Sequence, residues 1–324
     1  MTDQTRIPLP GESGSLIERA VESFGWNQFT PPPVPAAPEP TPQFADPTPA
    51  AVTAEPESAP AVLEPAQIIE AAPNPAGIAH PIDREHLRRQ GFIVPEGNVT
   101  ATLEEFRIVK RQLLLQVADL QRQGAGGPRA GWAQRVLICS PHPGEGKTYC
   151  AVNLALSIAA EKESEVLLVD ADFAKPSVLS ALGLPGGRGL MDALADPALD
   201  VADLVLATDV PGLKVLPAGE ATNRDSEYLA SSRTAAVLDR LTQGAPHRMV
   251  IFDSPPALAA SPAAELAKHV GQALVICRAD RTGQQSLEDA ISLLSGCPNI
   301  QLLLNATDFS PSGRRFGAYY GYGA

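Results

Sequence analysis

Residues 140–148 constrain this chain more than any other part of its sequence. They read Ser-Pro-His-Pro-Gly-Glu-Gly-Lys-Thr, after an apolar run at 136–139 and before a mostly apolar stretch at 149–158. A buried strand, a glycine-rich turn, Gly-Lys-Thr and a helix in this order predict a phosphate-binding loop. Gly144 and Gly146 let consecutive backbone N–H groups turn toward a polyphosphate, and the positive end of the helix dipole adds to their field.

Side chains of this loop predict how ATP and Mg²⁺ would be held. Lys147 is expected to reach the β- and γ-phosphates, and the Thr148 hydroxyl to ligate the Mg²⁺ ion. The strict motif has glycine at position 141, where this chain has proline. A chance Gly-Lys-Thr at a strand–helix turn is the alternative interpretation. The predicted nucleotide-binding residues are Pro143, Gly144, Glu145, Gly146, Lys147, Thr148 and Tyr149, together with Asn305 as a contact for the base.

Apolar runs and helical patterns alternate through the rest of the core. Strands are expected at 135–139, 165–170, 213–216, 248–253, 273–277 and 301–305, and helices at 148–160, 176–182, 227–243, 262–268 and 284–295. The strands are apolar along their whole length, as strands covered on both faces are. This alternation predicts an α/β fold with a doubly wound, mostly parallel sheet, as in P-loop NTPases that resemble partitioning ATPases. Ligands of such sheets bind at the carboxyl ends of the strands.

Acidic residues stand where two of these strands end. The run at 166–169 is followed by Asp170 and Asp172, and the run at 249–252 by Asp253, Ser254 and two prolines. An aspartate at a strand end is, alone, more often a cap or a turn former. Three of them beside a phosphate loop predict carboxylates around one cation with Thr148. The expected Mg²⁺ ligands are Thr148, Asp172 and Asp253.

The first 80 residues have a different composition. Residues 15–24 form a short amphipathic helix candidate within a segment 1–26, too short to be stable alone and therefore expected to dock on this chain or on a partner. Residues 27–80 predict a disordered linker, because 14 of the chain's 32 prolines lie within 31–80. The chain's net charge is −12, but six acidic residues and no Lys or Arg fall within 31–80.

This charge balance and the cysteines exclude several classes of protein. An acidic chain without a basic face does not favour general nucleic-acid binding. The four cysteines show no Cys-x-x-Cys spacing and are expected to be buried free thiols in a reducing cytosol. No apolar run approaches the roughly 18 residues of a membrane span. The sequence therefore predicts a cytoplasmic protein without a membrane span of its own.

A long helix is predicted at 102–122, inside a main domain at 81–310. Glu104, Arg107 and Lys110 are spaced by three residues and are expected to line one face of it. This charged stripe is either a subunit contact or a solvated surface.

The last segment, 311–324, is rich in tyrosine. Tyr319, Tyr320 and Tyr322 are three of the chain's five tyrosines and stand between glycines. Exposed hydroxyls on such a tail are suitable phosphoryl acceptors, and a sticky or packing segment is the alternative.

Taken together, these motifs resemble the bacterial tyrosine kinases that govern polysaccharide export. The resemblance covers most of 81–324 and is carried by the phosphate loop, Asp170-x-Asp172, the segment 253–256, the 104–110 helix and the tyrosine tail. The segments 15–21 and 104–111 are similar to the subgroup associated with exosortase-type exopolysaccharide loci.

The resemblance implies a protein-tyrosine kinase that phosphorylates its own tail between subunits of a ring, with residues 104–110 at the subunit contact. It implies Lys147, Asp170, Asp172 and Asp253 as catalytic residues, with Asp170 as base or orienter of the incoming hydroxyl. It also implies recruitment to the inner face of the plasma membrane by a membrane-embedded chain-length protein of the polysaccharide co-polymerase type.

The chain departs from the family pattern at two positions, because Ala174 and Lys110 stand where arginines are common. His142 stands where the related septum-positioning and partitioning ATPases carry a signature lysine, which disfavours that class. The second candidate function is a nucleotide-switched scaffold of the partitioning type, without kinase activity. The terminal tyrosines favour the kinase, because a switch ATPase has no use for them.

Overall fold

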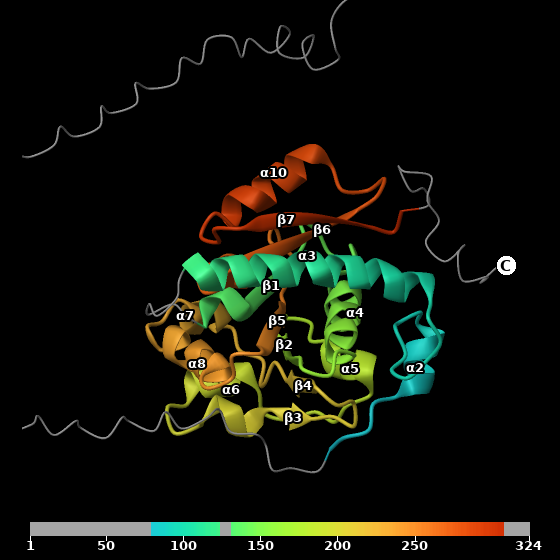
Figure 1. Ribbon diagram of the computed structural model, residues 1–324. Coiled ribbons are helices and arrows are strands. Elements are labelled where there is room, and N and C mark those ends of the chain that lie inside the picture. The colour runs from blue at the N-terminus through green and yellow to red at the C-terminus, as the bar shows by residue number, and fades with distance from the viewer. Residues whose placement is uncertain (1–78, 124–130, 308–324) are drawn as a thin grey trace, which may run out of the picture. The chain divides into compact units, whose positions relative to one another are not determined.

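A computed structural model describes residues 79–123 and 131–307 (Figure 1). The predicted N-terminal helix, the linker up to residue 78 and the tyrosine tail lie outside the described residues. The sheet has seven strands in the order β3-β4-β2-β5-β1-β6-β7. They are β1 Arg135–Cys139, β2 Glu165–Asp170, β3 Leu206–Ala207, β4 Leu213–Leu216, β5 Arg248–Asp253, β6 Gln272–Arg278 and β7 Ile300–Asn305. Only the β3–β4 pair is antiparallel, which confirms the predicted α/β, mostly parallel fold.

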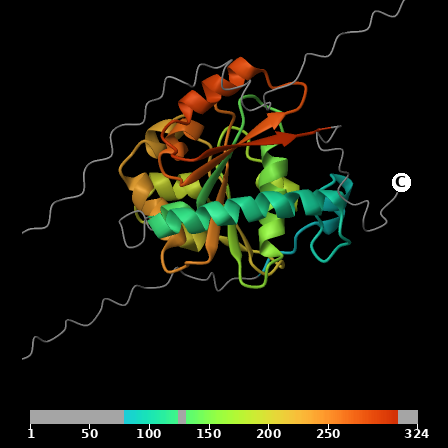
Figure 2. The same ribbon diagram turned by 45° about the horizontal axis from the view of Figure 1, so that its top comes forward.

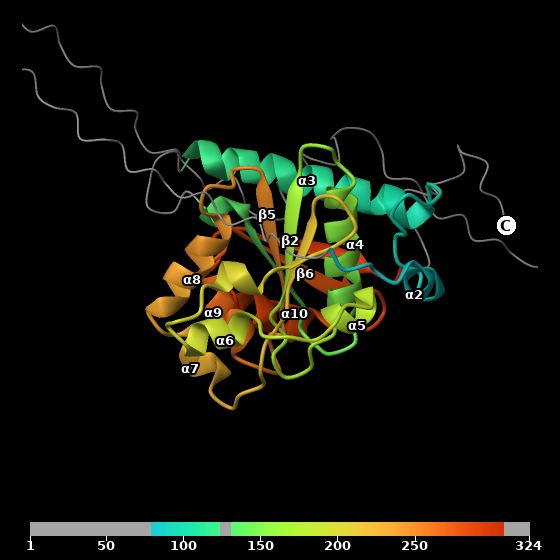
Figure 3. The ribbon, with the colours of Figure 1, turned by 90° about the horizontal axis from the view of Figure 1, so that it is seen from below.

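Helices cover both faces of this sheet (Figure 3). The helices are α2 Arg84–Arg89, α3 Ala101–Gln123, α4 Lys147–Ala159, α5 Val178–Leu182, α6 Leu190–Ala195, α7 Asp225–Leu229, α8 Arg233–Thr242, α9 Pro262–Ala267 and α10 Gln284–Leu293, with short 3-10 helices η2 Trp132–Gln134 and η3 Val201–Leu204. One apolar core contains residues of α3, α4 and α5, and the other contains residues of α6 to α10. The central strands are buried on both sides, as their uninterrupted apolar runs predict.

Local details differ from the prediction in four places. Strand β3 and the helices α2 and α6 were not predicted, because two and six residues are too few for a clear period. The stretch 227–243, expected as one helix, is broken between α7 and α8. The hydroxyl of Thr234 donates to the carbonyl of Tyr228 (2.9 Å) there, and Ser231 and Ser232 stand at the break. Serine and threonine side chains compete with helical backbone bonds in this way.

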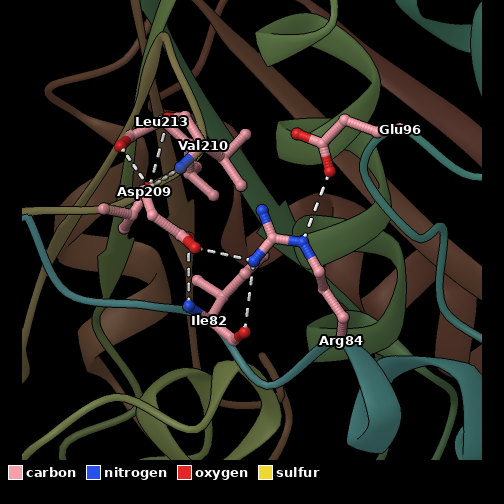
Figure 4. A network of polar contacts seen from close by, with 7 residues as sticks. Ile82, Arg84, Glu96, Asp209, Val210 and Leu213 are labelled. Carbon is pink, nitrogen blue, oxygen red and sulfur yellow. Dashed lines mark hydrogen bonds and ion pairs between the residues drawn. The ribbon is translucent and has the colours of Figure 1, made fainter.

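A strap, residues 79–98, fastens the chain to the β3 edge of the sheet. The His80 N–H donates to the Ala207 carbonyl and the Asp209 N–H donates to the His80 carbonyl, both at 2.9 Å. Residues 79 and 80, expected in the linker, therefore belong to the folded part. Figure 4 shows the Arg84 guanidinium between Asp209 (2.7 Å) and Glu96 (3.3 Å), while Asp209 also accepts from the Ile82 N–H.

This strap also reaches the helix of the phosphate loop. Ile93 is buried, and its N–H donates to Asn153 Oδ1 of α4 at 2.7 Å. The Tyr149 hydroxyl donates to the Gly91 carbonyl (2.8 Å), and the Tyr149 ring lies 5.1 Å from that of Phe92. The first turn of α4 is thus held by residues more than fifty positions earlier in the chain.

Helix α3 crosses α4 (Figure 2) and buries a stripe that includes a lysine. Phe106, Lys110, Leu113 and Val117 are its buried residues. The Lys110 ammonium lies 2.7 Å from Glu161 Oε1 and donates to a backbone carbonyl of α4 at 3.1 Å.

Lys110 is therefore absent from the exposed charged stripe that the spacing of three predicted. Three residues fall about 60° short of a full helical turn, so two such steps rotate a side chain by about 120°. Glu104 and Arg107 remain together as an ion pair. Beside them, Ile108 and Leu115 are exposed, the latter by 69%.

All four cysteines are buried free thiols, which confirms the prediction. Burial raises the pKa of Cys150 to about 12 and that of Cys297 to about 11, so neither is a ready nucleophile. Within the described ranges, no helix combines the length and the apolar character needed to cross a membrane.

Candidate nucleotide and catalytic site

The phosphate loop joins β1 to α4 at the carboxyl edge of the sheet, as predicted. Gly144 and Gly146 have positive φ angles of 77° and 98°, a conformation that side chains disfavour. A Cβ on Gly146 would also lie 2.2 Å from Nδ2 of Asn305, so the Asn305 side chain would have to move away from the loop. Lys147 follows the loop at the start of α4 and is 8% exposed.

Asp253 and Thr148 meet beside the loop. Asp253 ends β5 and is the register partner of Asp170, which ends β2. The Thr148 hydroxyl donates to Asp253 Oδ2 (2.6 Å) and lies 3.0 Å from the Ser177 hydroxyl. Asp253 Oδ1 is buried and has no hydrogen-bond partner. An orphaned carboxylate oxygen next to a threonine hydroxyl is a donor set that Mg²⁺ prefers.

Burial gives the two strand-end carboxyls unusual proton affinities. It raises the pKa of Asp253 to about 7, although the Thr148 hydroxyl and the charge of Lys147 act in the opposite direction. Burial raises the pKa of Asp170 to about 6. The pKa of Asp172 is raised for the same reason. A cation at Asp253 would offset this loss of hydration.

Asp170 is occupied by backbone amides. Its Oδ2 accepts from the N–H groups of Ser177 and Val178, both at 2.9 Å, and its Oδ1 accepts from Asp172 N–H at 3.3 Å. The carboxylate therefore shapes the loop after β2 and is fully buried. Asp172 is half-buried, and one of its oxygens accepts from Lys175 N–H at 3.1 Å.

The expected arrangement of three carboxylates around one cation is not assembled. Among residues 79–123 and 131–307, no three His, Cys, Asp or Glu side chains are grouped as metal ligands. The Asp170 carboxylate does not take part, because three backbone N–H groups of the loop after β2 donate to it. The Thr148 and Asp253 pair is the part of the predicted set that the structure brings together.

Glu145 braces the loop from inside. Its side chain is 4% exposed, accepts from the His142 N–H at 2.7 Å, and accepts from the Thr282 hydroxyl. The same hydroxyl accepts from Arg278 N–H at 2.8 Å, so the turn after β6 is closed onto the loop. Because the Glu145 carboxylate points into this brace, the predicted nucleotide contact of Glu145 would fall to its backbone.

Two further contacts complete the brace. The Arg278 guanidinium donates to the Gly144 carbonyl (3.1 Å), and Asn305 Nδ2 donates to the Glu145 carbonyl (2.9 Å). Asn305 therefore lies beside the loop, as predicted, with its amide engaged. Sequence reasoning missed Arg278 and Thr282, because Thr282 lies 137 residues from Glu145 and belongs to no motif.

Thr282→Val should weaken ATP binding about tenfold, because the buried Glu145 carboxylate would lose one of its two donors. Losing a hydrogen bond to a charged group typically costs about 1.5–3 kcal/mol. Isothermal titration calorimetry with the chain and Mg-ATP measures the effect, with Thr282→Ser as the matched control that keeps the hydroxyl. Equal affinity of the valine and serine variants would contradict a role for this bond.

Tyr149 turns away from the phosphate loop. Its hydroxyl and ring are engaged with the strap, so only its backbone remains for the predicted nucleotide contact. Glu104 and Arg107 belong to α3, which packs against α4. Their link to the phosphate loop therefore runs through α4. Tyr319, Tyr320 and Tyr322 lie outside the described residues.

Comparison with curated proteins gives named relatives, while no family model matches the chain. Tyrosine-protein kinase ptk of Acinetobacter johnsonii is 31% identical over 153 residues, which are 47% of this chain and 20% of that protein. Tyrosine-protein kinase YwqD of Bacillus subtilis is 29% identical over 194 residues, 60% of this chain and 76% of that protein. The chain spans about a quarter or less of the length of several longer relatives, for example 24% of one from Ralstonia solanacearum.

Solved structures show the same fold. The chimerical protein CapA2B2 matches with a TM-score of 0.53 and 23% identity, over 69% of this chain and 99% of that one. The BceF tyrosine kinase domain matches with a TM-score of 0.52 and 23% identity, over 69% of this chain and 90% of that one. At this identity the likeness concerns the arrangement of the sheet and helices.

Proposed function

We propose that this chain is an ATP-dependent protein-tyrosine kinase that phosphorylates its own Tyr319, Tyr320 and Tyr322. The observation that carries the proposal is the braced phosphate loop with Thr148 bonded to Asp253 and an orphaned oxygen beside it. The names of the curated relatives supply the acceptor class. The reaction transfers the γ-phosphoryl group of ATP to a tyrosine hydroxyl and releases ADP.

Different residues of the site would bind the phosphates and the metal ion during phosphoryl transfer. Lys147 and the loop amides would bind the β- and γ-phosphates and stabilise charge that develops on them. Thr148 and Asp253 would hold Mg²⁺, which neutralises phosphate charge when bound. Gly144 and Gly146 have the positive φ angles that let the loop amides turn toward a phosphate.

The proton of the incoming tyrosine requires an acceptor. Asp170 was the expected base, but three amides occupy its oxygens and its side chain is fully buried. We therefore assign Asp170 to positioning the loop after β2. Asp172 is the more accessible carboxylate at that strand end, and its raised pKa suits a group that orients a hydroxyl.

Incubation with Mg-ATP should add up to three phosphates to the chain, all mapping to residues 319–322. Intact-mass spectrometry measures the gain, and a variant with these three tyrosines changed to Phe is the control that should gain few. Three phosphates bring about five negative charges into four residues, so repulsion should also loosen the assembly. ATP hydrolysis without any phosphotyrosine would support the nucleotide-switched scaffold and contradict the kinase.

The proposal extends to assembly and partners. A ring of copies, in contact through α3, would let one subunit's tail enter a neighbour's site. The chain would act in exopolysaccharide synthesis and export, in the exosortase-associated subgroup. A membrane-embedded chain-length protein would recruit it to the inner face of the plasma membrane and activate it. The exposed Ile108 and Leu115 beside the Glu104–Arg107 pair support a contact on this face of α3.

Arg107→Glu should lower the mass of the assembly in light scattering while leaving the melting temperature of the monomer nearly unchanged. Arg107 lies on the exposed side of α3. Lys110→Glu is the informative companion, because it would place a buried negative charge beside that of Glu161 and lower the melting temperature by several degrees. An unchanged mass for Arg107→Glu would leave the pair as a solvated surface feature.

A further inference from the structure

Strand β7 is an uncharged edge with an open apolar side. It reads Ile-Gln-Leu-Leu-Leu-Asn, and among the described residues no strand pairs with it on the side away from β6. Leu302 and Leu304, two of the six residues of this strand, are 55% and 58% exposed. Natural sheets protect such edges with charges, prolines or a covering segment, because bare edges pair with other strands.

The backbone of β7 is also open toward that side. The Ala273 N–H donates to the Asn299 carbonyl, and the Ala279 N–H donates to the Asn305 carbonyl. In a parallel ladder every second residue pairs with the same neighbour. The odd-numbered residues of β7 therefore pair with β6, and Leu302 and Leu304 direct their N–H and C=O groups outward.

We infer that the chain's own segment 314–320 docks on this edge as an added strand. The described part of the chain ends at Thr307, two residues beyond β7, and residues 308–324 follow it in the sequence. Residues 310–313, Ser-Pro-Ser-Gly, have turn chemistry. The alternation in 314–320 puts Phe316, Ala318 and Tyr320 on one face, which matches the exposed leucines.

The length of the connection fixes the direction of this strand. A parallel return needs a crossover of about a dozen residues or more, whereas only residues 308–313 separate the described part of the chain from the docking segment. An antiparallel return needs only the turn. Tethering by a few residues gives the segment an effective concentration in the millimolar range, which favours it over a second copy as the occupant.

An antiparallel strand carries the tyrosines away from their own nucleotide site. Asn305 lies at the phosphate loop, and the strand would return toward Ile300, about 17–20 Å away at some 3.3 Å per residue. The docked tyrosines would thus lie out of reach of the nucleotide site of their own subunit. This consequence rests on the proposed kinase function. A phosphate of about −2 charge on Tyr320 would disfavour docking against leucines and release the tail.

Hydrogen–deuterium exchange of residues 300–305 tests the docking in the dephosphorylated full chain without nucleotide. The Leu302 and Leu304 amides should exchange at least tenfold more slowly in the wild type than in Phe316→Asp. Trypsin cleavage after Arg314 and Arg315 should be correspondingly faster in Leu304→Asp. Leu293→Asp, which charges an exposed leucine on α10, is the matched control and should change neither rate.

Equal exchange in the wild type and in Phe316→Asp would overturn the inference. Protection that disappears on tenfold dilution, with a tail that trypsin cleaves freely, would also overturn it and assign the edge to a second copy. Both measurements are made without ATP. Failure of docking is therefore distinguishable from failure of the kinase function, because the intact-mass experiment measures the kinase function separately.

Discussion

Lys147→Ala should abolish ATP-dependent tyrosine phosphorylation of the chain. The lysine begins α4 directly behind the phosphate loop, and its charge partly offsets the burial that raises the pKa of Asp172 and of Asp253. Removing a preorganised charge or donor from such a site typically reduces kcat by about 10²–10³. Radiolabelled ATP or a phosphotyrosine antibody measures the loss on the purified chain.

Lys162→Ala is the matched control, because Lys162 is an exposed lysine in the turn just after α4. This control should retain full labelling, and both variants should melt near the wild-type temperature. Undiminished labelling of Lys147→Ala would remove the nucleotide site from the proposed function. Lost labelling with a collapsed melting curve would require Lys147→Arg, which keeps the charge, to separate folding from catalysis.

Asp253→Asn should make the ligand-free chain more stable at pH 8 by a few kcal/mol and remove its response to Mg²⁺. The native pKa of Asp253 is about 7, above its ordinary value of 3.8. Between these values the native state binds more protons than the unfolded state, so stability falls as the pH rises from about 4 to 7. Asparagine has no charge to bury, and the variant should escape most of that fall.

Thermal unfolding at pH 5 and pH 8, without nucleotide or Mg²⁺, checks this expectation. The stability of the variant should still fall with rising pH, but by less, because the pKa of Asp170 is also raised, to about 6. Asp203→Asn is the control, because Asp203 is exposed and should leave the wild-type pH dependence intact. A variant less stable than the wild type at pH 8 would show that the Thr148 bond outweighs the buried charge.

Much of the site could be predicted because its parts are local in the sequence. The order of strand, glycine turn, Gly-Lys-Thr and helix specifies its own geometry within about twenty residues. The uninterrupted apolar runs identified β1, β2, β4 and β5 with their bounds, and β6 and β7 within one residue. The positions of Asp170 and Asp253 at strand ends then follow, since parallel strands end at one edge of the sheet.

Other features depended on distant residues. The burial of Lys110 needs the carboxylate of Glu161 and a carbonyl of α4, and the residue spacing within α3 predicts neither contact. The occupation of Asp170 by three amides needs the loop after β2 to fold back on its own strand. The same holds for Thr282, which reaches Glu145 only when β6 lies beside β1.

By itself, the sequence determined the α/β class, the phosphate loop and the edge at which its carboxylates gather. Short-range rules are sufficient there, because backbone conformation and side-chain period act within a few residues. Tertiary structure alone decided which polar groups stay available: Asp253 Oδ1 is left without a partner, while Lys110 and Asp170 are taken. A buried polar group satisfies its hydrogen bonds with whatever neighbour the packing brings, and that neighbour is set by the fold and not by distance along the chain.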